Sequence, residues 1–306
     1  MIRVAAVDCG TNSVRLLVAD VDTSTGKLTD LERQMEITRL GQGVDRTGQF
    51  NPEALRRTLG VVEDYAEIIR RLGATAVRVA ATSATRDASN RDEFVRGVRE
   101  LLAVDPEVIS GDEEAALSYA GSTRELTHPG PCLVVDIGGG STEYVLGDGS
   151  ARASISVDIG SVRITERHFE HDPPEPEQVE AAVADIDAAL ARVGEAVPLE
   201  EAATLVGVAG TVTTVAGIVL ELPEYDPVRI HHSRIGMDDV CAVSGRLLAM
   251  THNERAANPV IHPGRVDVIA AGALILSRTL RRLGLRDFVV SEHDILDGLA
   301  VETALR

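Results

Sequence analysis

Two stretches of this sequence combine an aspartate with glycine and hydroxyl residues in the same order. The first is VDCGTNSVRLLVAD at residues 7–20, and the second is VDIGGGSTEYVLGD at residues 135–148. Asp8 and Asp136 lie 128 positions apart, and the same shift also matches the preceding valine, the following glycine and the serine. Four matches in register indicate an internal repeat rather than chance.

Each copy predicts a strand that ends in aspartate, a tight turn and a second strand. Backbone N–H groups and hydroxyls in such a turn face one point and can hold phosphate oxygens. Aspartate repels phosphate, so we expect it to hold a divalent cation, or the water shell of that cation, beside the phosphate. The alternative is that both turns only connect two strands. Because the pattern occurs twice in register, we favour phosphate binding.

A third polar stretch, ATSATRDASN at residues 81–90, follows a predicted buried strand. It offers several donors that suit phosphate, and Arg86 is the charged one among them. The alternative is a polar connection with Arg86 on the surface, and the sequence leaves both open. The donors are Thr82, Ser83, Thr85, Arg86 and Asn90.

The stretch SGDEEAALSYAG at residues 110–121 places two glutamates at the start of a predicted helix. Ser110 and Glu113 have the spacing of a capping box, which gives Glu113 a structural role. Glu114 has no such role. The helix N-terminus favours its ionised form, which can orient or deprotonate a water molecule.

Composition limits the classes of function. A chain of 306 residues with 44% hydrophobic content predicts about two globular domains. The net charge of −18 argues against general binding to nucleic acid or to anionic membranes. We see neither a membrane-spanning apolar run nor a basic leader, so we expect a cytoplasmic protein. The three cysteines, at 9, 132 and 241, lack metal-binding spacing and are interpreted as packing residues.

The pattern of hydrophobic residues predicts alternating strands and helices. Strands are expected at 2–8, 14–20 and about 28–38, followed by a helix from Asn51-Pro52 to Gly73. A strand at 77–82, a helix at 91–102, a strand at 106–110 and a helix at 112–122 come next. The second copy is expected to begin near Pro129, and a last strand and a closing helix end the pattern.

The order of these motifs resembles the exopolyphosphatase and guanosine pentaphosphate phosphohydrolase (Ppx/GppA) family, within the sugar kinase, Hsp70 and actin superfamily. The resemblance spans essentially the whole chain. The closing VVSEHDILDGLAVE is similar to the end of the short, two-domain actinobacterial exopolyphosphatases. Other members of the family often carry Ser-Asp, Gly and Arg-Glu-Gly in place of the SEHDILDG of this chain. The motifs that carry it are VDCGTNSVRLLVAD, ATSATRDASN, PEVISGDEEAALSYAG, LVVDIGGGSTEYVLG and VGVAGTVTTVAG.

The resemblance implies roles for individual residues. Glu114 matches the catalytic glutamate that positions or activates water, and Arg86 matches the arginine that grips the terminal phosphate. Asp8, Asp136 and Glu143 match the acidic residues associated with the divalent ion. A third loop contains Gly207, Gly210 and Thr211, for which close packing of a strand against a helix is the alternative. The two phosphate loops correspond to Gly10, Thr11, Asn12 and Ser13 and to Gly138, Gly139, Gly140 and Ser141.

We therefore expect an α/β protein of two ribonuclease-H-like domains that flank a cleft. The first domain would cover residues 1–124, and the C-terminal helix 294–306 could return to it; the second would cover 125–306. The expected reaction is Mg²⁺-dependent hydrolysis of the terminal phosphoanhydride of inorganic polyphosphate, with Mn²⁺ as an alternative ion. Guanosine pentaphosphate is the alternative substrate, and a polyphosphate or alarmone sensor without catalysis is the alternative function. The family suggests a homodimer, and Arg15, just after the first turn, adds a donor for an anionic substrate.

Overall fold

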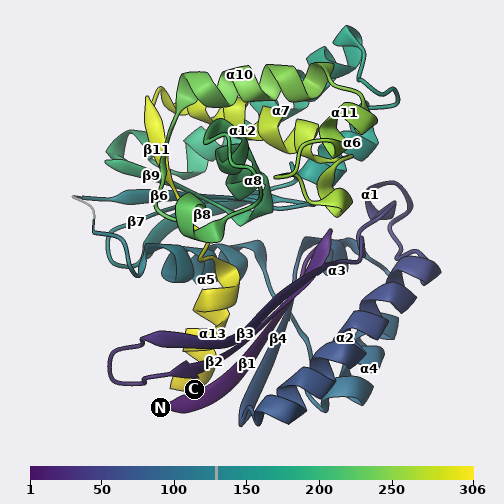
Figure 1. The fold of residues 1–306 in the computed structure, drawn as a ribbon, viewed down its shortest axis with the longest axis vertical. Helices are drawn as coiled ribbons and strands as arrows, with labels where there is room; N and C mark the ends of the chain where they lie inside the picture. Colours follow the sequence, from purple (N-terminus) through teal and green to yellow (C-terminus); the bar gives the residue numbers. More distant parts are fainter. Residues whose placement is uncertain (128–129) are drawn as a thin grey trace. The chain divides into compact units, whose positions relative to one another are not determined.

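The computed structural model describes residues 1–127 and 130–306, and the chain forms two units in it (Figure 1). Unit 1 comprises Met1–Gly121 and Ile295–Arg306, and unit 2 comprises Ser122–Asp294. Pro129, where we expect the second copy to begin, lies outside the described residues. Among the residues that are described, no helix is long and apolar enough to cross a lipid bilayer.

Unit 1 is built on a mixed five-stranded sheet with the order β3-β2-β1-β4-β5. β1, β2 and β3 are antiparallel, as expected for the first meander, whereas β4 runs parallel to β1 and β5 parallel to β4. The strands are β1 (Ile2–Cys9), β2 (Ser13–Val21), β3 (Leu28–Ile37), β4 (Ala76–Ala81) and β5 (Glu107–Val108). The helices are α1 (Val44–Thr47), α2 (Pro52–Leu72), α3 (Ser83–Asp87), α4 (Arg91–Leu102), α5 (Gly111–Thr123) and α13 (Ile295–Leu305).

Both faces of this sheet are buried, because β1 alternates its side chains between two cores. Ala5 and Val7 pack into the core that α2 and α4 cover, and Val4 and Ala6 pack into the core that α13 covers (Figure 1). The last helix therefore completes the core of the first unit, although it follows the whole of unit 2 in the chain.

The boundaries of α2 follow from local chemistry. The Asn51 side chain accepts hydrogen bonds from the N–H groups of Glu53 and Ala54, and Pro52 occupies the first turn. Gly73 ends the helix in a left-handed conformation, at φ +70°. Asn51, Pro52 and Gly73 are the signals from which the helix could be predicted.

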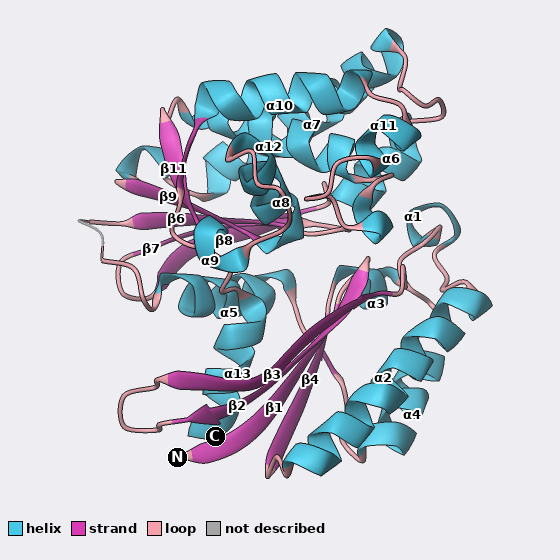
Figure 2. Cartoon of the chain, viewed as in Figure 1, coloured by secondary structure: helices cyan, strands magenta, loops and turns pink. Residues whose placement is uncertain are grey.

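Unit 2 contains a six-stranded sheet with the order β10-β11-β9-β6-β7-β8, and helices α7, α10 and α12 cover one face of it (Figure 2). β6 pairs antiparallel with β7 and parallel with β9, and β9 pairs parallel with β11. The strands are β6 (Cys132–Ile137), β7 (Thr142–Gly147), β8 (Ala151–Val157), β9 (Thr204–Val208), β10 (Arg234–Gly236) and β11 (Asp287–Val290). The helices are α6 (Ser161–His168), α7 (Pro176–Ala196), α8 (Ala209–Val219), α9 (Pro227–Ile230), α10 (Met237–Ala249), α11 (His252–Ala256) and α12 (Ile269–Leu283).

The two sheets share one topology. The order β8-β7-β6-β9-β11 in unit 2 repeats the order β3-β2-β1-β4-β5 in unit 1, with β10 added as an antiparallel edge strand. The internal repeat in the sequence thus reflects two ribonuclease-H-like sheets, and the predicted α/β fold class is confirmed. The first copy of the repeat is the β1–β2 hairpin and the second is the β6–β7 hairpin.

Two of the three cysteines are buried in these sheets. Burial, and then the negative charge of Asp8, raise the pKa of the Cys9 thiol well above its ordinary value. Burial and the charge of Asp148 raise the pKa of Cys132 to about 12. Both thiols therefore stay protonated at neutral pH and pack as small apolar side chains.

Candidate active site

Three parallel strands of unit 1 bring its predicted site residues to one edge of the sheet. β1, β4 and β5 all end there, because Asp8 pairs with Ala80 and Ala80 pairs with Glu107. The first loop (residues 10–13), α3 and α5 follow these three strand ends. The topology thus gathers Asp8, Arg86 and Glu114, which are far apart in the sequence, at the carboxyl edge of one sheet.

The backbone of the first loop is oriented by hydrogen bonds to its carbonyl groups. The Gly10 N–H donates to the Ser13 carbonyl at 2.9 Å and closes the turn. The Thr11 carbonyl accepts from the Gly41 N–H at 2.8 Å, and the Asn12 carbonyl accepts from the N–H groups of residues 38 and 39. Because each peptide group is planar, the N–H groups that follow these carbonyls point to the opposite side. The first loop therefore presents successive N–H groups away from residues 38–41, as an anion-binding loop requires.

Asp8 and Arg15 form an ion pair in unit 1. They lie directly opposite each other on β1 and β2, and Nη2 of Arg15 donates to Oδ2 of Asp8 at 2.7 Å. Asp8 is 4% exposed. The sequence analysis gave these residues separate roles, in metal binding and in substrate binding. In the structure the two side chains pair with each other, and both roles stay predictions.

Arg86 and Glu114 form a second ion pair at the same edge. Nη1 of Arg86 lies 2.7 Å from Oε2 of Glu114 and also donates to the Ile109 carbonyl at 3.1 Å. Neither side chain is on the open surface, since they are 23% and 12% exposed. The polar connection that we considered at 81–90 is partly a helix, α3, which turns Arg86 toward α5.

Asn90 does not join this pair. Its Oδ1 accepts from the Phe50 N–H at 2.8 Å, and its amide nitrogen donates to the Phe50 carbonyl at 3.4 Å. Both ends of the amide therefore bind the segment before α2, and Asn90 has a structural role instead of the phosphate-binding one that its composition suggested.

The start of α5 agrees only in part with the predicted capping box. The Ser110 hydroxyl accepts from the Glu113 N–H at 3.2 Å, as expected. The Glu113 carboxylate accepts from Nη2 of Arg78, on β4, also at 3.2 Å. A buried guanidinium attracts a carboxylate more strongly than a neutral backbone N–H does, so the structural role of Glu113 is an ion pair across unit 1.

In unit 2, the second loop (residues 138–141) is held by the N-terminus of α6. The N–H groups of Ser161 and Val162 donate to the carbonyls of Gly138 and Gly139, both at 2.9 Å. Here too the carbonyls point toward their donors, so the following N–H groups point the other way. Gly160 is required at this contact, because a Cβ there would lie 2.3 Å from the Gly139 oxygen.

Arg163, on α6, is a residue in contact with the second loop that the sequence analysis missed. It is 9% exposed, and its Nε donates to the Gly140 carbonyl at 2.6 Å. A signal for it was available, because the tetrapeptide VDIG that precedes the second loop occurs again at residues 157–160, just before α6.

Asp136 and Glu143 lie directly opposite each other on β6 and β7. They are 6% and 1% exposed, and Oε1 of Glu143 accepts from the Ser156 hydroxyl at 2.7 Å. Two carboxylates in facing positions of a sheet repel each other, and a divalent cation with oxygen ligands would offset that repulsion. This pair is the part of unit 2 whose chemistry best fits a hard metal ion such as Mg²⁺.

The predicted third loop is the junction between β9 and α8 in the structure: Gly207 lies in β9, and Gly210 and Thr211 lie in the first turn of α8. A Cβ at Gly207 would lie 2.8 Å from Val212 and 2.9 Å from Phe288, and a Cβ at Gly210 would lie 2.2 Å from the guanidinium of Arg265. Thr211 is buried at 6% exposure. Gly207 thus packs closely against side chains, whereas Gly210 lies under a charged side chain. The substrate-binding role of these three residues stays a prediction.

Glu125, His231 and His293 form a cluster beyond the end of β11 that sequence spacing did not reveal. Oε2 of Glu125 lies 3.9 Å from Nε2 of His231 and 3.7 Å from Nδ1 of His293. Nδ1 of His231 accepts from the Glu292 N–H at 3.1 Å, so the neutral ring carries its proton on Nε2, facing Glu125. A metal ion would need the lone pair of that nitrogen, so this tautomer of His231 does not suit a metal ligand.

Comparisons with known proteins agree with this geometry. A model of the Ppx/GppA phosphatase family matches residues 17–306. Exopolyphosphatase 2 of Mycobacterium tuberculosis is 48% identical and aligns with 99% of this chain and 98% of its own length. A guanosine-5′-triphosphate,3′-diphosphate pyrophosphatase of Vibrio atlanticus is 38% identical over 54% of this chain and 33% of its own length.

Solved structures show the same similarity. The crystal structure of an exopolyphosphatase-like protein is 40% identical, with a TM-score of 0.95 and coverage of 98% of both chains. The Ppx/GppA family member of Aquifex aeolicus is 32% identical, with a TM-score of 0.83 and coverage of 99% of this chain and 98% of its own. The similarity thus extends over both units of the chain.

Proposed function

The chain belongs to the Ppx/GppA phosphatase family, and on that basis we propose that it is an exopolyphosphatase. It hydrolyses the terminal phosphoanhydride of inorganic polyphosphate and releases orthophosphate. The observation that carries this proposal is the Arg86–Glu114 ion pair at the carboxyl edge of the unit 1 sheet, the same edge from which the first loop starts. An anion-binding loop next to a paired carboxylate and guanidinium supplies both substrate binding and a base.

In the proposed reaction, Glu114 orients the attacking water and accepts its proton. The water oxygen bonds to the terminal phosphorus as the bond to the bridging oxygen breaks, and the shortened polyphosphate leaves with the electron pair. Arg86 stabilises the charge on the equatorial oxygens. In the structure the two side chains already lie side by side, with Nη1 of Arg86 2.7 Å from Oε2 of Glu114.

Asp136 and Glu143 are the residues that we expect to hold Mg²⁺, with Mn²⁺ as an alternative. Their facing carboxylates supply the hard oxygen ligands that these ions prefer. When bound, the ion would neutralise phosphate charge. Asp8 is a weaker candidate, because Arg15 already neutralises it.

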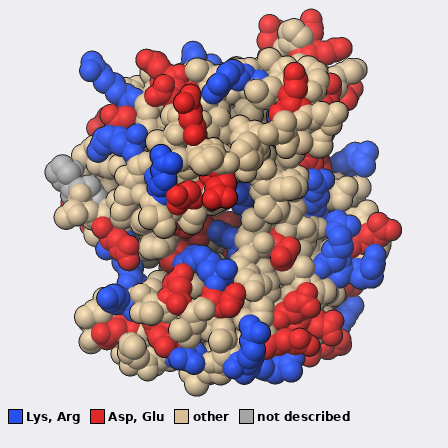
Figure 3. All heavy atoms as spheres, in the orientation of Figure 1, with Lys and Arg blue, Asp and Glu red and all other residues tan. Residues whose placement is uncertain are grey.

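Charge is a second requirement for this function, because the substrate is a polyanion and the chain carries a net charge of −18. Figure 3 shows acidic and basic side chains interspersed over the visible face. The long-range field of the net negative charge therefore slows the encounter between the protein and polyphosphate, whereas Arg86 and the loop N–H groups attract the phosphate at short range. Added salt should screen the distant repulsion more than the half-buried contacts, since exposed charges are screened most strongly.

Guanosine pentaphosphate is the second candidate substrate, supported by the similarity to the Vibrio atlanticus pyrophosphatase over about half of the chain. Both substrates present the same terminal anhydride, so the loops and the Arg86–Glu114 pair would serve either one.

A homodimer and a cytoplasmic location are further expectations, which sedimentation and cell fractionation would test.

One experiment separates these possibilities. Phosphate release is measured side by side from short polyphosphate, long polyphosphate and guanosine pentaphosphate, with Mg²⁺ present or chelated. We expect release from polyphosphate that stops on chelation and is absent in Glu114→Gln. Release from guanosine pentaphosphate alone would select the second substrate. Tight polyphosphate binding without release from any substrate would indicate a sensor.

A further inference from the structure

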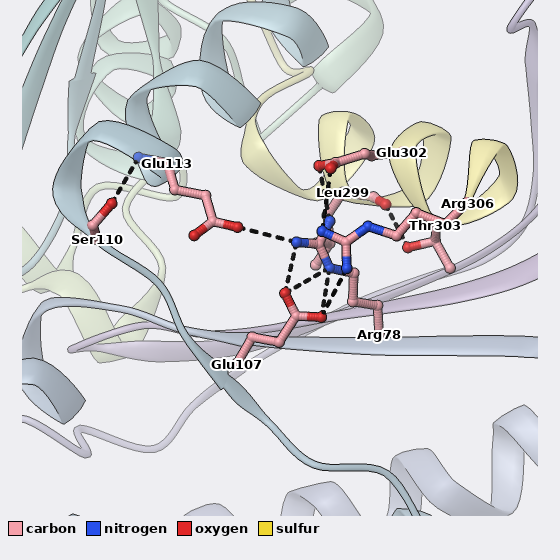
Figure 4. A network of polar contacts seen from close by, with 8 residues as sticks. All are labelled: Arg78, Glu107, Ser110, Glu113, Leu299, Glu302, Thr303 and Arg306. Carbon is pink, nitrogen blue, oxygen red and sulfur yellow. Dashed lines mark hydrogen bonds and ion pairs between the residues drawn. The ribbon is translucent and has the colours of Figure 1, made fainter.

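Arg78 is a buried arginine of unit 1 that the proposed reaction does not use. It lies on β4 and is 4% exposed. Its guanidinium binds carboxylates from three different elements, shown in Figure 4. Nη2 lies 2.6 Å from Glu107 on β5 and 3.2 Å from Glu113 on α5, and Nη1 lies 2.8 Å from Glu302 on α13.

A second arginine closes this cluster from the outside. Nη1 of Arg306 lies 3.2 Å from Glu107, and its Nη2 lies 3.2 Å from Glu302. Burial alone would lower the pKa of Arg78, but the hydrogen bonds to Glu107 and Glu302 outweigh it and leave that pKa above its ordinary value. Arg78 thus stays charged, and its guanidinium ties β4, β5, α5 and α13 together.

The backbones of α13 and α5 are also in direct contact. A Cβ at Gly298 would lie 2.1 Å from the Leu117 carbonyl, so only glycine allows this approach. Leu117 lies one helical turn after Glu113. The last helix therefore touches α5 twice, through Gly298 and through the Glu302–Arg78–Glu113 chain of contacts.

The first turn of α5 is held by one arginine on each of two sides. Glu113 binds Arg78, and the next residue, Glu114, binds Arg86. Successive residues of a helix point about 100° apart. A change at Arg78 would therefore let the helix turn about its axis and move the Glu114 carboxylate without touching it.

We propose that Arg78 is a positioning residue for hydrolysis, which sets the orientation of Glu114 through Glu113 and through the last helix. This inference rests on the proposed function, in which Glu114 is the base. Because Gly298 contacts α5 and Glu302 binds Arg78, residues 295–306 also help to position Glu114 on this proposal.

The test is a double-mutant cycle on kcat with Arg78→Lys and Glu113→Ala. Lysine keeps the charge but cannot bind three carboxylates in a planar array. We expect each variant to lose between about tenfold and about a hundredfold in kcat with little change in KM. The double variant should fall no further, because both changes break one path. The inference would be overturned if the kcat losses of the two single variants multiply in the double variant. It would also be overturned if either single variant keeps a kcat within about twofold of the wild type.

Arg255→Lys is the matched control. Arg255 is also 4% exposed and binds the Asp172 carboxylate at 2.6 Å, but it lies in unit 2 on α11. Both lysine variants should lower Tm, and only Arg78→Lys should lower kcat at temperatures where both are folded. If Arg78→Lys does not fold, Glu302→Gln replaces it, because Glu302 is half-exposed. We expect this variant to lose less kcat than Arg78→Lys. An unchanged kcat in Glu302→Gln would count against the inference.

The outcomes also separate this inference from the proposed function. A wild type that releases no phosphate from any substrate would refute the proposed function. A wild type that hydrolyses polyphosphate, with Arg78 and Glu113 variants of full kcat, would refute only the role of Arg78.

Discussion

Glu143 occupies in unit 2 the position that Arg15 occupies in unit 1. Each lies directly opposite the aspartate that ends the first strand of its hairpin, Asp136 and Asp8 respectively. Unit 1 thus has an ion pair where unit 2 has two facing carboxylates. On our proposal, the facing carboxylates of unit 2 are the pair that would hold a divalent cation.

Removing one of these carboxylates should change the response to Mg²⁺. In Asp136→Asn we expect a higher Mg²⁺ requirement for activity and a smaller rise of Tm on adding Mg²⁺, because one ligand is lost and the repulsion is already relieved. Thermal unfolding with Mg²⁺ or chelator measures the second effect without any turnover. Asp185→Asn, on α7, is the control and should keep the wild-type Mg²⁺ shift. Full wild-type activity in excess chelator would contradict the metal-assisted mechanism.

The neighbours Glu113 and Glu114 should respond differently to the same change. Glu114→Gln should lower kcat by about 10²–10⁴-fold and leave polyphosphate binding intact, because the amide cannot accept the water proton. Glu113→Gln keeps an oxygen that accepts from Arg78, so we expect a small loss of stability and a kcat within about threefold of the wild type. Phosphate release and thermal unfolding of both variants check this. Equal loss of kcat with unchanged Tm would mean that the roles are assigned wrongly.

Arg86 should act in the transition state. Arg86→Ala should cost about 2–4 kcal/mol in kcat/KM, the range for removing one donor to developing charge. Arg86→Lys should recover only part of this, because it keeps the charge but loses the planar fork. Steady-state hydrolysis of polyphosphate provides the measurement. If both variants stay within about threefold of the wild type, Arg86 has no catalytic role.

The contact between Gly160 and the second loop predicts a large effect of one methyl group. In Gly160→Ala the new Cβ would lie 2.3 Å from the Gly139 oxygen and 2.5 Å from the Gly140 nitrogen, and both are backbone atoms. We expect a loss of about 1–3 kcal/mol in stability and a weaker apparent affinity for polyphosphate, because the loop must move. Gly245→Ala, on α10, has open space within 4 Å and should stabilise the protein by about 0.5–1 kcal/mol. Similar behaviour of the two variants would contradict the packing argument.

The Arg78 cluster should make stability sensitive to acid. The hydrogen bond from Arg78 lowers the pKa of Glu107. Burial raises the pKa of Glu302, but the hydrogen bonds and charges of Arg78 and Arg306 together outweigh burial, so both pKa values lie below the ordinary 4.5. A carboxylate whose pKa is lowered in the folded protein resists protonation there. Its contribution to the free energy of unfolding is therefore complete above its ordinary pKa and is lost as the pH falls through its pKa in the folded protein. Urea unfolding between about pH 6 and about pH 3 should show a steeper loss in the wild type than in Glu302→Gln. The exposed Glu180→Gln should keep the wild-type slope, and an equal slope in all three would refute the expectation.

Local sequence rules were sufficient for much of the fold. Asn51, Pro52 and Gly73 carry the boundaries of α2 in their own chemistry, and the apolar runs at 2–8 and 14–20, bounded by short turns, predicted β1 and β2. The repeated turns were visible because both copies keep the aspartate, the glycine and the serine.

The remaining features depend on contacts that no local pattern contains. Arg78 and Glu302 lie 224 positions apart, so only the folded sheet shows that they meet. Glu113 was assigned to a capping box because a window of four residues cannot reveal a distant guanidinium. His231 and His293 meet for the same reason, through the return of the chain to the end of β11.

The placement of α13 has a consequence for how the protein is made. A ribosome delivers residues 295–306 only after all of unit 2 has been synthesised, yet the core of unit 1 needs Leu296 and Leu299 from that segment. Unit 2 can therefore fold during translation while unit 1 waits with one face of its sheet uncovered. Until the last helix arrives, Arg78 lacks Glu302 and α5 lacks its contact at Gly298. If Arg78 positions Glu114 as we propose, Glu114 is therefore not held in place for hydrolysis until residues 295–306 have been made.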